Sequence, residues 1–286
     1  MTAAASDSTE KTTTPITPTS WAVFTKPWRT LAPANLAQLV ARMGFNAVEF
    51  PLRPGYQVDL EGLESSFSAL VTILSDHGIQ IASVAASLDS RVLATCAEHG
   101  IDLVRIMVPI GSDGFVATRD AIRRQLDALV PDAAEYGVKI GVQPHHDFYV
   151  ADSSELAVLL EDYDPRIVVA IWDAAHDGLA CKRPINSLEL LWDRLAMVNF
   201  KNACQTPTNH RSEGAIGWDI TFVEGTEGLC SWPEAAHYLR SRGYGGPVCL
   251  PAEYTDETNI EAKVSRDLAY LRALIGDGDA KVEVRA

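Results

Sequence analysis

The sequence predicts a single (β/α)8 TIM barrel of the α/β class, and three observations support this prediction. Short apolar runs alternate with helical stretches from residue 21 almost to the end of the chain, as in repeated βα units. Eight apolar runs can be counted, which is the number of strands in this barrel. The chain has 286 residues, a length that suits one complete barrel.

The chain divides into one domain and two terminal segments. Residues 1–20 are rich in Thr, Ser, Ala and Pro and have no hydrophobic period, so we expect a disordered N-terminal tail there. Residues 21–275 are expected to form the barrel, which is the catalytic domain. Residues 276–286 follow the last helix without any motif and are expected to form a C-terminal tail.

The predicted strands are short and apolar. They lie at residues 22–24, 47–50, 79–85, 103–108, 138–142, 167–172, 195–200 and 247–252. Helices are expected between them, mainly at residues 33–43, 60–77, 118–136, 153–160, 232–242 and 260–274, and several end at a glycine suited to a left-handed C-cap. We expect residues 202–229 to form a loop that is long for a barrel. No glycine-rich phosphate loop opens a βα unit, so a closed barrel is preferred to an open doubly wound sheet.

Composition excludes several functional classes. The net charge of −14 opposes binding to a nucleic-acid backbone, which relies on clustered Lys and Arg. No apolar run approaches the roughly 20 residues that span a bilayer, and the N-terminus lacks the pattern of a signal peptide. The five cysteines have no CxxC spacing and are expected to be reduced thiols. We therefore expect a cytoplasmic protein with neither a nucleic-acid partner nor a membrane partner.

Polar side chains stand at the ends of several predicted strands. Every strand of such a barrel ends at the same mouth, so these side chains are expected to converge. They are Glu49, Gln143, Asp173, Asn199 and Glu253. Neighbouring carboxylates repel one another unless a cation or a shared proton is present, and oxygen ligands favour Mg²⁺ or Mn²⁺. The sequence therefore predicts a divalent metal site at the barrel mouth.

Four segments of the sequence resemble the xylose-isomerase-like sugar phosphate isomerase/epimerase superfamily, and the resemblance covers about residues 21–274. The segments are Gly44-Phe45-Asn46-Ala47-Val48-Glu49, Gly137-Val138-Lys139-Ile140-Gly141-Val142-Gln143-Pro144-His145, Asp173-Ala174-Ala175-His176, and Gly243-Tyr244-Gly245-Gly246-Pro247 before Glu253. The resemblance implies a TIM barrel that acts on sugars. It also implies that the histidine of the Asp-x-x-His motif, His176, contacts the substrate.

The resemblance further implies a metal held at the ends of strands five to eight, where the family has Glu, Asp, His and Glu. The corresponding positions here are Gln143, Asp173, Asn199 and Glu253. Two of the four positions therefore depart from the family pattern. Amide oxygens can still bind a hard cation, so we expect Mn²⁺ or Mg²⁺ in preference to Zn²⁺. His210, which lies farther along the chain, is the alternative to Asn199 as the fourth ligand.

The substitution at residue 143 bears on proton transfer. Isomerisation beside a carbonyl needs one group to remove a carbon-bound proton and another to return it. The resemblance implies two glutamates in these roles, but the amide of Gln143 cannot accept a proton at neutral pH. Glu253 remains one candidate, and His145 is the first choice for the other because imidazole titrates near neutrality. His145 is equally consistent with a surface-loop histidine, and His176 or Glu49 can also serve in acid/base catalysis.

Other residues near the strand ends are candidates for substrate binding. Lys26, Arg53 and Lys201 can supply positive charge to an enediolate or to a substrate anion, and Trp28 can stack on a sugar ring. Considered alone, each of the three charged residues is also consistent with an ordinary solvated residue on the protein surface.

The function expected from these features is a sugar isomerase or epimerase that removes a proton beside a carbonyl with the help of a metal. One alternative is a lyase of the same superfamily, such as the catalytic subunit of a C-glycoside deglycosidase that acts on 3-keto glycosides by β-elimination. A second alternative is a non-catalytic carbohydrate-binding barrel. The expected partner is a small sugar or glycoside, and a homo-oligomer or a small partner subunit is compatible with the sequence.

Overall fold

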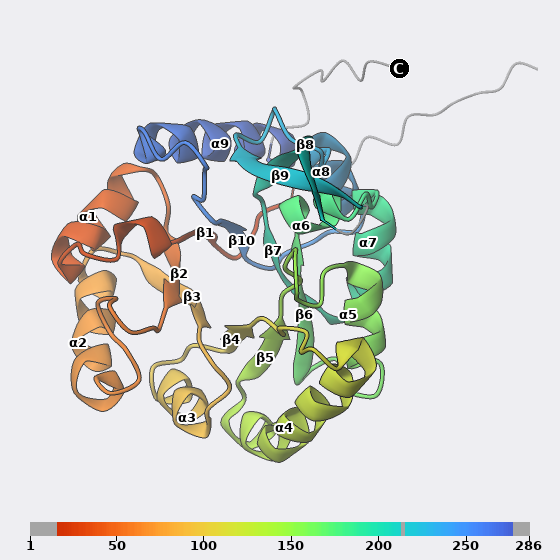
Figure 1. Cartoon of the computed structure of the whole chain (residues 1–286). Coiled ribbons are helices and arrows are strands. Elements are labelled where there is room, and N and C mark those ends of the chain that lie inside the picture. The colour runs from red at the N-terminus through yellow and green to blue at the C-terminus, as the bar shows by residue number, and fades with distance from the viewer. Residues whose placement is uncertain (1–15, 213–214, 277–286) are drawn as a thin grey trace, which may run out of the picture.

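Eight parallel strands close into one barrel that is surrounded by helices. The computed structural model describes residues 16–212 and 215–276, and it describes side chains outside residues 209–216. The strand order around the barrel is β1-β10-β7-β6-β5-β4-β3-β2, as seen along the barrel axis in Figure 1. The predicted single (β/α)8 TIM barrel is therefore confirmed.

The strands and helices follow the predicted order. The barrel strands are β1 (Trp21–Phe24), β2 (Ala47–Pro51), β3 (Gln80–Ala85), β4 (Leu103–Ile106), β5 (Lys139–Val142), β6 (Val168–Asp173), β7 (Leu195–Asn199) and β10 (Val248–Leu250). The helices are α1 (Pro33–Arg42), α2 (Leu63–Asp76), α3 (Ser90–Glu98), α4 (Gly114–Tyr136), α5 (Ser153–Leu160), α6 (Ala174–Leu179), α7 (Pro184–Leu191), α8 (Trp232–Ser241) and α9 (Ile260–Ile275). Short 3-10 helices lie at Lys26–Trp28 and Trp192–Arg194.

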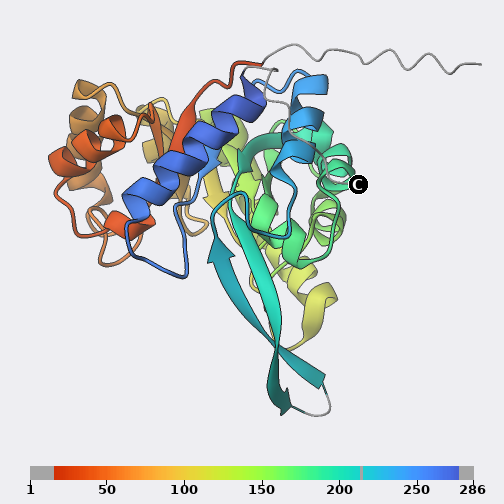
Figure 2. The same ribbon diagram turned by 90° about the horizontal axis from the view of Figure 1, so that it is seen from above.

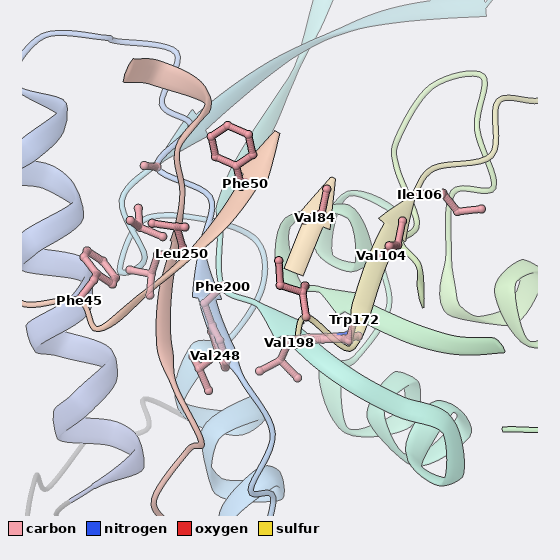
Figure 3. Packing of buried hydrophobic residues seen from close by; sticks show 14 of the residues in the cluster. Phe45, Phe50, Val84, Val104, Ile106, Trp172, Val198, Phe200, Val248 and Leu250 are labelled. Atoms are coloured by element: carbon pink, nitrogen blue, oxygen red, sulfur yellow. The ribbon is translucent and has the colours of Figure 1, made fainter. Parts of the chain in front are cut away.

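Side chains along each strand alternate between two hydrophobic layers. Trp172, Val198 and Phe200 belong to the outer layer between strands and helices, part of which is drawn in Figure 3. The barrel interior holds a second cluster, composed of Ala22, Phe24, Ala47, Ala85, Leu103, Val169, Ile171, Met197 and Cys249. A residue two positions beyond an interior residue also points inward. The alternation therefore directs the polar strand-end side chains into the mouth of the barrel.

The segment after β7 is a β-hairpin, so the loop predicted for residues 202–229 is corrected. β8 (Asn202–Ser212) pairs with β9 (Ala215–Val223) in antiparallel fashion, and Figure 2 shows this ribbon projecting away from the barrel. The side chain of Asn202 fixes its base by donating to the carbonyls of Gly225 and Cys230, each at 2.9 Å. The sequence did not predict this hairpin because β8 is mostly polar. A polar segment lacks the apolar run that marks a buried strand.

The last residues of the predicted N-terminal tail lie along the barrel. The Thr19 N–H donates to the Gly245 carbonyl, and the Ser20 carbonyl accepts from the Val248 N–H, both at 3.0 Å. Residues 1–15 and 277–286 lie outside the described part of the chain, so the remainder of both predicted tails stays a prediction. Among the described helices, none is long and apolar enough to cross a membrane.

Candidate active site

Glu49 and Arg105 form an ion pair inside the barrel. Arg105 Nε lies 2.9 Å from Oε1 of Glu49 and Nη2 lies 3.0 Å from Oε2, while Ser83 Oγ donates to Oε1 at 3.0 Å. The guanidinium of Arg105 also stacks on the ring of Phe24 at 4.8 Å. Three donors engage the fully buried carboxylate. Glu49, expected as an acid/base group, is thus held by partners within the protein.

Asp173 ends β6 and caps the first turn of α6. Its Oδ1 accepts hydrogen bonds from the N–H groups of Ala175 and His176 at 3.0 and 3.3 Å, and Oδ2 accepts from Gln143 Nε2 at 2.6 Å. Burial raises the pKa of this carboxyl to about 6, although the nearby Lys201 ammonium opposes the rise. Asp173 is therefore an anchor of the local structure as well as a charge at the barrel mouth.

Two amide side chains at the mouth retain unpaired polar atoms. Gln143 Oε1 and both polar atoms of the Asn199 side chain are buried and have no hydrogen-bond partner within the described residues. Both residues line a narrow pocket in the barrel mouth. Each unsatisfied buried polar group costs about 1–3 kcal/mol, so a ligand that hydrogen-bonds to them is favoured.

Glu253 follows β10 and is bound by two lysines. Lys201 Nζ lies 2.9 Å from Oε2, and Lys26 Nζ donates to Oε1. Burial alone would raise the pKa of Glu253, but the two ammonium groups outweigh it and bring the pKa below its usual range. For Lys201, burial is likewise outweighed by the carboxylates of Glu253 and Asp173, so its pKa is raised. Glu253 is consequently ionised and a weak base, and Lys201 is a buried cation.

A donor faces each ring nitrogen of His176. The His146 N–H lies 3.2 Å from Nδ1, and the Lys201 ammonium lies 3.2 Å from Nε2. Burial, followed by the charge of Lys201, lowers the pKa of His176 well below its usual value, and the ring is neutral. The ammonium can only donate, so Nε2 is the acceptor of the hydrogen bond from Lys201. His176 therefore helps to hold the ammonium in place.

His145 offers a basic nitrogen. Its Nδ1 lies 2.9 Å from the His146 carbonyl, which can only accept, so the ring proton is on Nδ1 and Nε2 is an acceptor. Burial lowers the pKa of His145 to about 4, and the Lys201 charge acts in the same direction. At neutral pH the ring is thus uncharged. Within the described residues, no hydrogen bond engages Nε2.

The pocket has a narrow inner part and a wider outer part. Its inner lining includes Arg53, Met107 and His145, and the outer cleft of about 450 Å³ is lined partly by Tyr56 and Phe222. Both parts share Lys26 and Glu253. The ring of Phe222, from β9, has its centroid 4.6 Å from Lys201 Nζ. The hairpin therefore contributes one wall of the site.

The predicted substrate-binding residues have different positions. Lys26, Arg53 and Lys201 line the inner pocket. Within the described chain no hydrogen bond or ion pair engages the side chain of Arg53, whose guanidinium lies 5.9 Å from the Phe24 ring. Trp28 is 9% exposed and packs in the outer hydrophobic layer, so the structure does not bring it to the pocket. His210 lies in β8, but its side chain is outside the described part.

The four predicted metal ligands are not arranged to fit a divalent ion. The Lys201 ammonium binds Glu253, and Asp173 is engaged by Gln143. No cluster of three or more His, Cys, Asp or Glu with metal-site geometry occurs among the described residues. A divalent ion about 4 Å from the ammonium would be repelled by about 8 kcal/mol at an effective dielectric of 20. We therefore derive no chemical step through a metal.

Arg105 and Phe222 are among the site residues that were not predicted from the sequence. Arg105 is a single charge in the apolar run of β4, and a charge inside a barrel strand is a signal that could have identified it. Phe222 lies in the segment expected to be a loop, and no local pattern distinguishes it as a site residue.

The closed eight-stranded parallel barrel, with polar side chains gathered at its mouth, defines the chain as a TIM barrel. A family model described as xylose isomerase-like TIM barrel matches residues 37–274, and the chain belongs to this family.

A curated protein is similar to part of the chain. The chain is similar to the inosose dehydratase of Bacillus licheniformis, with 26% identity over 133 residues. This match covers 45% of the chain and 44% of the dehydratase, so the chain matches less than half the length of this curated relative.

Solved structures share the fold along most of the chain. The 3-keto-D-glucoside 4-epimerase of E. coli superposes with a TM-score of 0.68 at 16% identity, covering 88% of this chain and 98% of the epimerase. A xylose isomerase-like TIM barrel protein of Mycobacterium smegmatis in complex with magnesium superposes with a TM-score of 0.66 at 15% identity, covering 93% and 98%. At these identities the likeness is one of fold.

Proposed function

We propose that the protein is an enzyme that removes a proton beside the carbonyl of a keto-sugar or a cyclic keto-polyol. The observation that carries this proposal is the buried Lys201 ammonium, which lines the inner pocket together with His145. Of its three N–H groups, one binds Glu253 and one lies toward His176, so one remains for a ligand. A fixed positive charge suits a carbonyl oxygen that gains negative charge as it becomes an enolate.

The proposed base is His145. Its Nε2 accepts the carbon-bound proton, and the electrons of the broken C–H bond move to the carbonyl oxygen. The resulting negative charge is stabilised by the Lys201 ammonium. Arg53 and Lys26 add positive charge to the pocket. Glu253 orients both lysines through its two oxygens.

Isomerisation is the outcome that this arrangement favours over epimerisation. Epimerisation at one carbon removes a proton from one face and returns it to the other, so it needs competent groups on both sides. The Gln143 amide cannot accept a proton, and both oxygens of Glu253 are occupied by the ammonium groups of Lys26 and Lys201. A single base that returns the proton to the neighbouring carbon, with a shift of the hydroxyl proton between the two oxygens, completes an isomerisation.

Dehydration is the second candidate. The enolate formed by the same step can expel a β-hydroxyl group, which leaves with a proton as water. The partial similarity to an inosose dehydratase favours this outcome. Both reactions share their first step, so both depend on His145 and Lys201.

Proton exchange in deuterated water tests the proposal. The protein is incubated with keto-sugars, inososes and 3-keto glucosides, and products are followed by NMR. Deuterium in an isomerised product supports isomerisation, whereas loss of water or of an aglycone supports a lyase. His145→Gln should abolish exchange, and His237→Gln, at an exposed position on α8, should not. The absence of exchange with every compound would contradict the proposal and leave a carbohydrate-binding barrel.

A further inference from the structure

Lys201 places an ammonium group among the side chains that correspond to the metal-binding positions of the family. Its Nζ lies 2.9 Å from Glu253 Oε2 and 3.2 Å from His176 Nε2. The same imidazole nitrogen is 3.9 Å from Oδ2 of Asp173. Only 4% of the Lys201 side chain is exposed. The ammonium is therefore an interior group of the site and no mobile surface charge.

The charges at this point balance without any added ion. Asp173 and Glu253 supply two carboxylates, and Lys26 and Lys201 supply two ammonium groups, of which both bind Glu253. A divalent cation would leave this group of side chains with an excess of two positive charges. Such an excess in a largely buried site is unfavourable.

The two departures from the family pattern agree with this balance. Gln143 and Asn199 are neutral where the family has a carboxylate and an imidazole, so the site has fewer strong ligands for a divalent ion. Gln143 Nε2 instead donates to Asp173 at 2.6 Å, which directs the donor side of the amide toward the carboxylate. The side chains around Lys201 thus form an environment for a monovalent cation.

We propose that the Lys201 ammonium takes the place of the divalent ion and that its charge keeps such an ion out of the site. The catalytic part of this inference, in which the ammonium polarises the substrate carbonyl, rests on the proposed function. The binding part does not, because it concerns only the competition between Lys201 and a metal for the same carboxylates.

Metal binding by the intact protein tests the proposal without any substrate. Chelator-treated protein is titrated with Mn²⁺, and binding is followed by electron paramagnetic resonance and calorimetry. The unaltered protein should bind no Mn²⁺ at Asp173. Lys201→Met removes the positive charge and keeps a long apolar side chain beside Phe222. In a double variant, Gln143→Glu is added to supply a third carboxylate. This double variant should bind one Mn²⁺ per chain, at least about 100-fold more tightly than any residual binding by the unaltered protein.

Two control variants isolate the charge of Lys201. Lys201→Arg keeps the positive charge and should not gain Mn²⁺ binding. Lys182→Met removes a lysine that is paired with Asp152 at 3.2 Å, away from the pocket, and should behave as the unaltered protein. Stoichiometric Mn²⁺ binding by the unaltered protein that is lost in Asp173→Asn would overturn the proposal. Failure of the folded double variant to bind Mn²⁺ would also overturn it.

The two proposals can fail separately. If the Mn²⁺ titrations give the expected results but no compound exchanges deuterium, the role of Lys201 stands and the proposed reaction is wrong. If exchange occurs and the unaltered protein binds Mn²⁺ at Asp173, the reaction stands and the role of Lys201 is wrong.

Discussion

Arg105 and Glu49 are joined by two parallel hydrogen bonds, Nε to Oε1 at 2.9 Å and Nη2 to Oε2 at 3.0 Å, in the interior of the barrel. The side chains are 4% and 0% exposed, so neither charge can be satisfied by water if its partner is removed. The pair connects β2 to β4 across the floor of the pocket.

Replacing one member of this pair should destabilise the barrel. Glu49→Gln leaves a buried guanidinium without its counter-ion, and we expect the free energy of unfolding to fall by about 3–5 kcal/mol. Denaturant titration of the variant measures the change. The double variant Glu49→Leu with Arg105→Met removes both charges and should recover most of the loss. Equal instability of the single and double variants would contradict a role for the ion pair itself.

Asp173→Asn should increase stability at alkaline pH. Burial raises the pKa of Asp173 to about 6, above its value in the unfolded chain. The folded protein therefore holds this proton more tightly, and the associated stability is complete below about pH 4 and is lost as the pH rises through about 6. Asparagine is neutral at every pH and can still cap α6. The variant should exceed the unaltered protein by roughly 1–3 kcal/mol at pH 8.

Urea denaturation between pH 5 and pH 8 checks this dependence. Asp164→Asn is a useful control because the Arg166 side chain lowers the pKa of Asp164 to about 2, which gives the opposite sign. A gain in Asp173→Asn that does not grow with pH would count against ionisation as its cause.

The activity of the enzyme should persist to unusually low pH. His145 must be neutral to accept a proton, and burial lowers its pKa to about 4. In the free enzyme, kcat/KM should therefore be constant through the normal range of histidine titration near pH 6.5 and should fall only as the pH approaches about 4. A pH profile of kcat/KM with an acid limb near 6.5 would show that another group, or a differently placed His145, limits the reaction.

Phe222→Ala should impair catalysis more than stability. Phe222 packs 4.6 Å from Lys201 Nζ and closes one side of the cleft, so its removal admits water and loosens the cation. We expect kcat/KM to fall by about 10- to 100-fold. Trp218→Ala is the matched control, since Trp218 lies on the same strand and is 54% exposed. Similar losses in both variants would indicate a general effect of the hairpin.

The sequence correctly predicted the barrel and the strand-end side chains that point into its mouth, for a simple physical reason. Barrel strands alternate inward and outward residues, and Asp173 and Asn199 follow apolar interior positions by two residues. Lys201 and Glu253 lie beyond the ends of β7 and β10 and also line the pocket, but the positive φ of 53° at Ala252 shows that strand alternation does not extend to Glu253. The strand bounds agree to within two residues because the apolar runs are short and end at polar residues or turns.

The contacts between those residues could not be predicted in the same way. Whether the space between Asp173 and Glu253 contains a metal or the ammonium of Lys201 depends on side-chain conformations at the ends of different strands. The pairing of Arg105 with Glu49 joins residues 56 positions apart in the sequence. The hairpin was missed because its pairing, and not an apolar pattern, defines it.

The buried ammonium beside Glu253 is part of the polypeptide itself. Its occupancy is one per chain from the moment of folding, with no loading step, no dissociation constant and no sensitivity to chelators. The cation is therefore present in every folded chain whatever the metal content of its surroundings, and its burial keeps it from reagents that modify exposed amines.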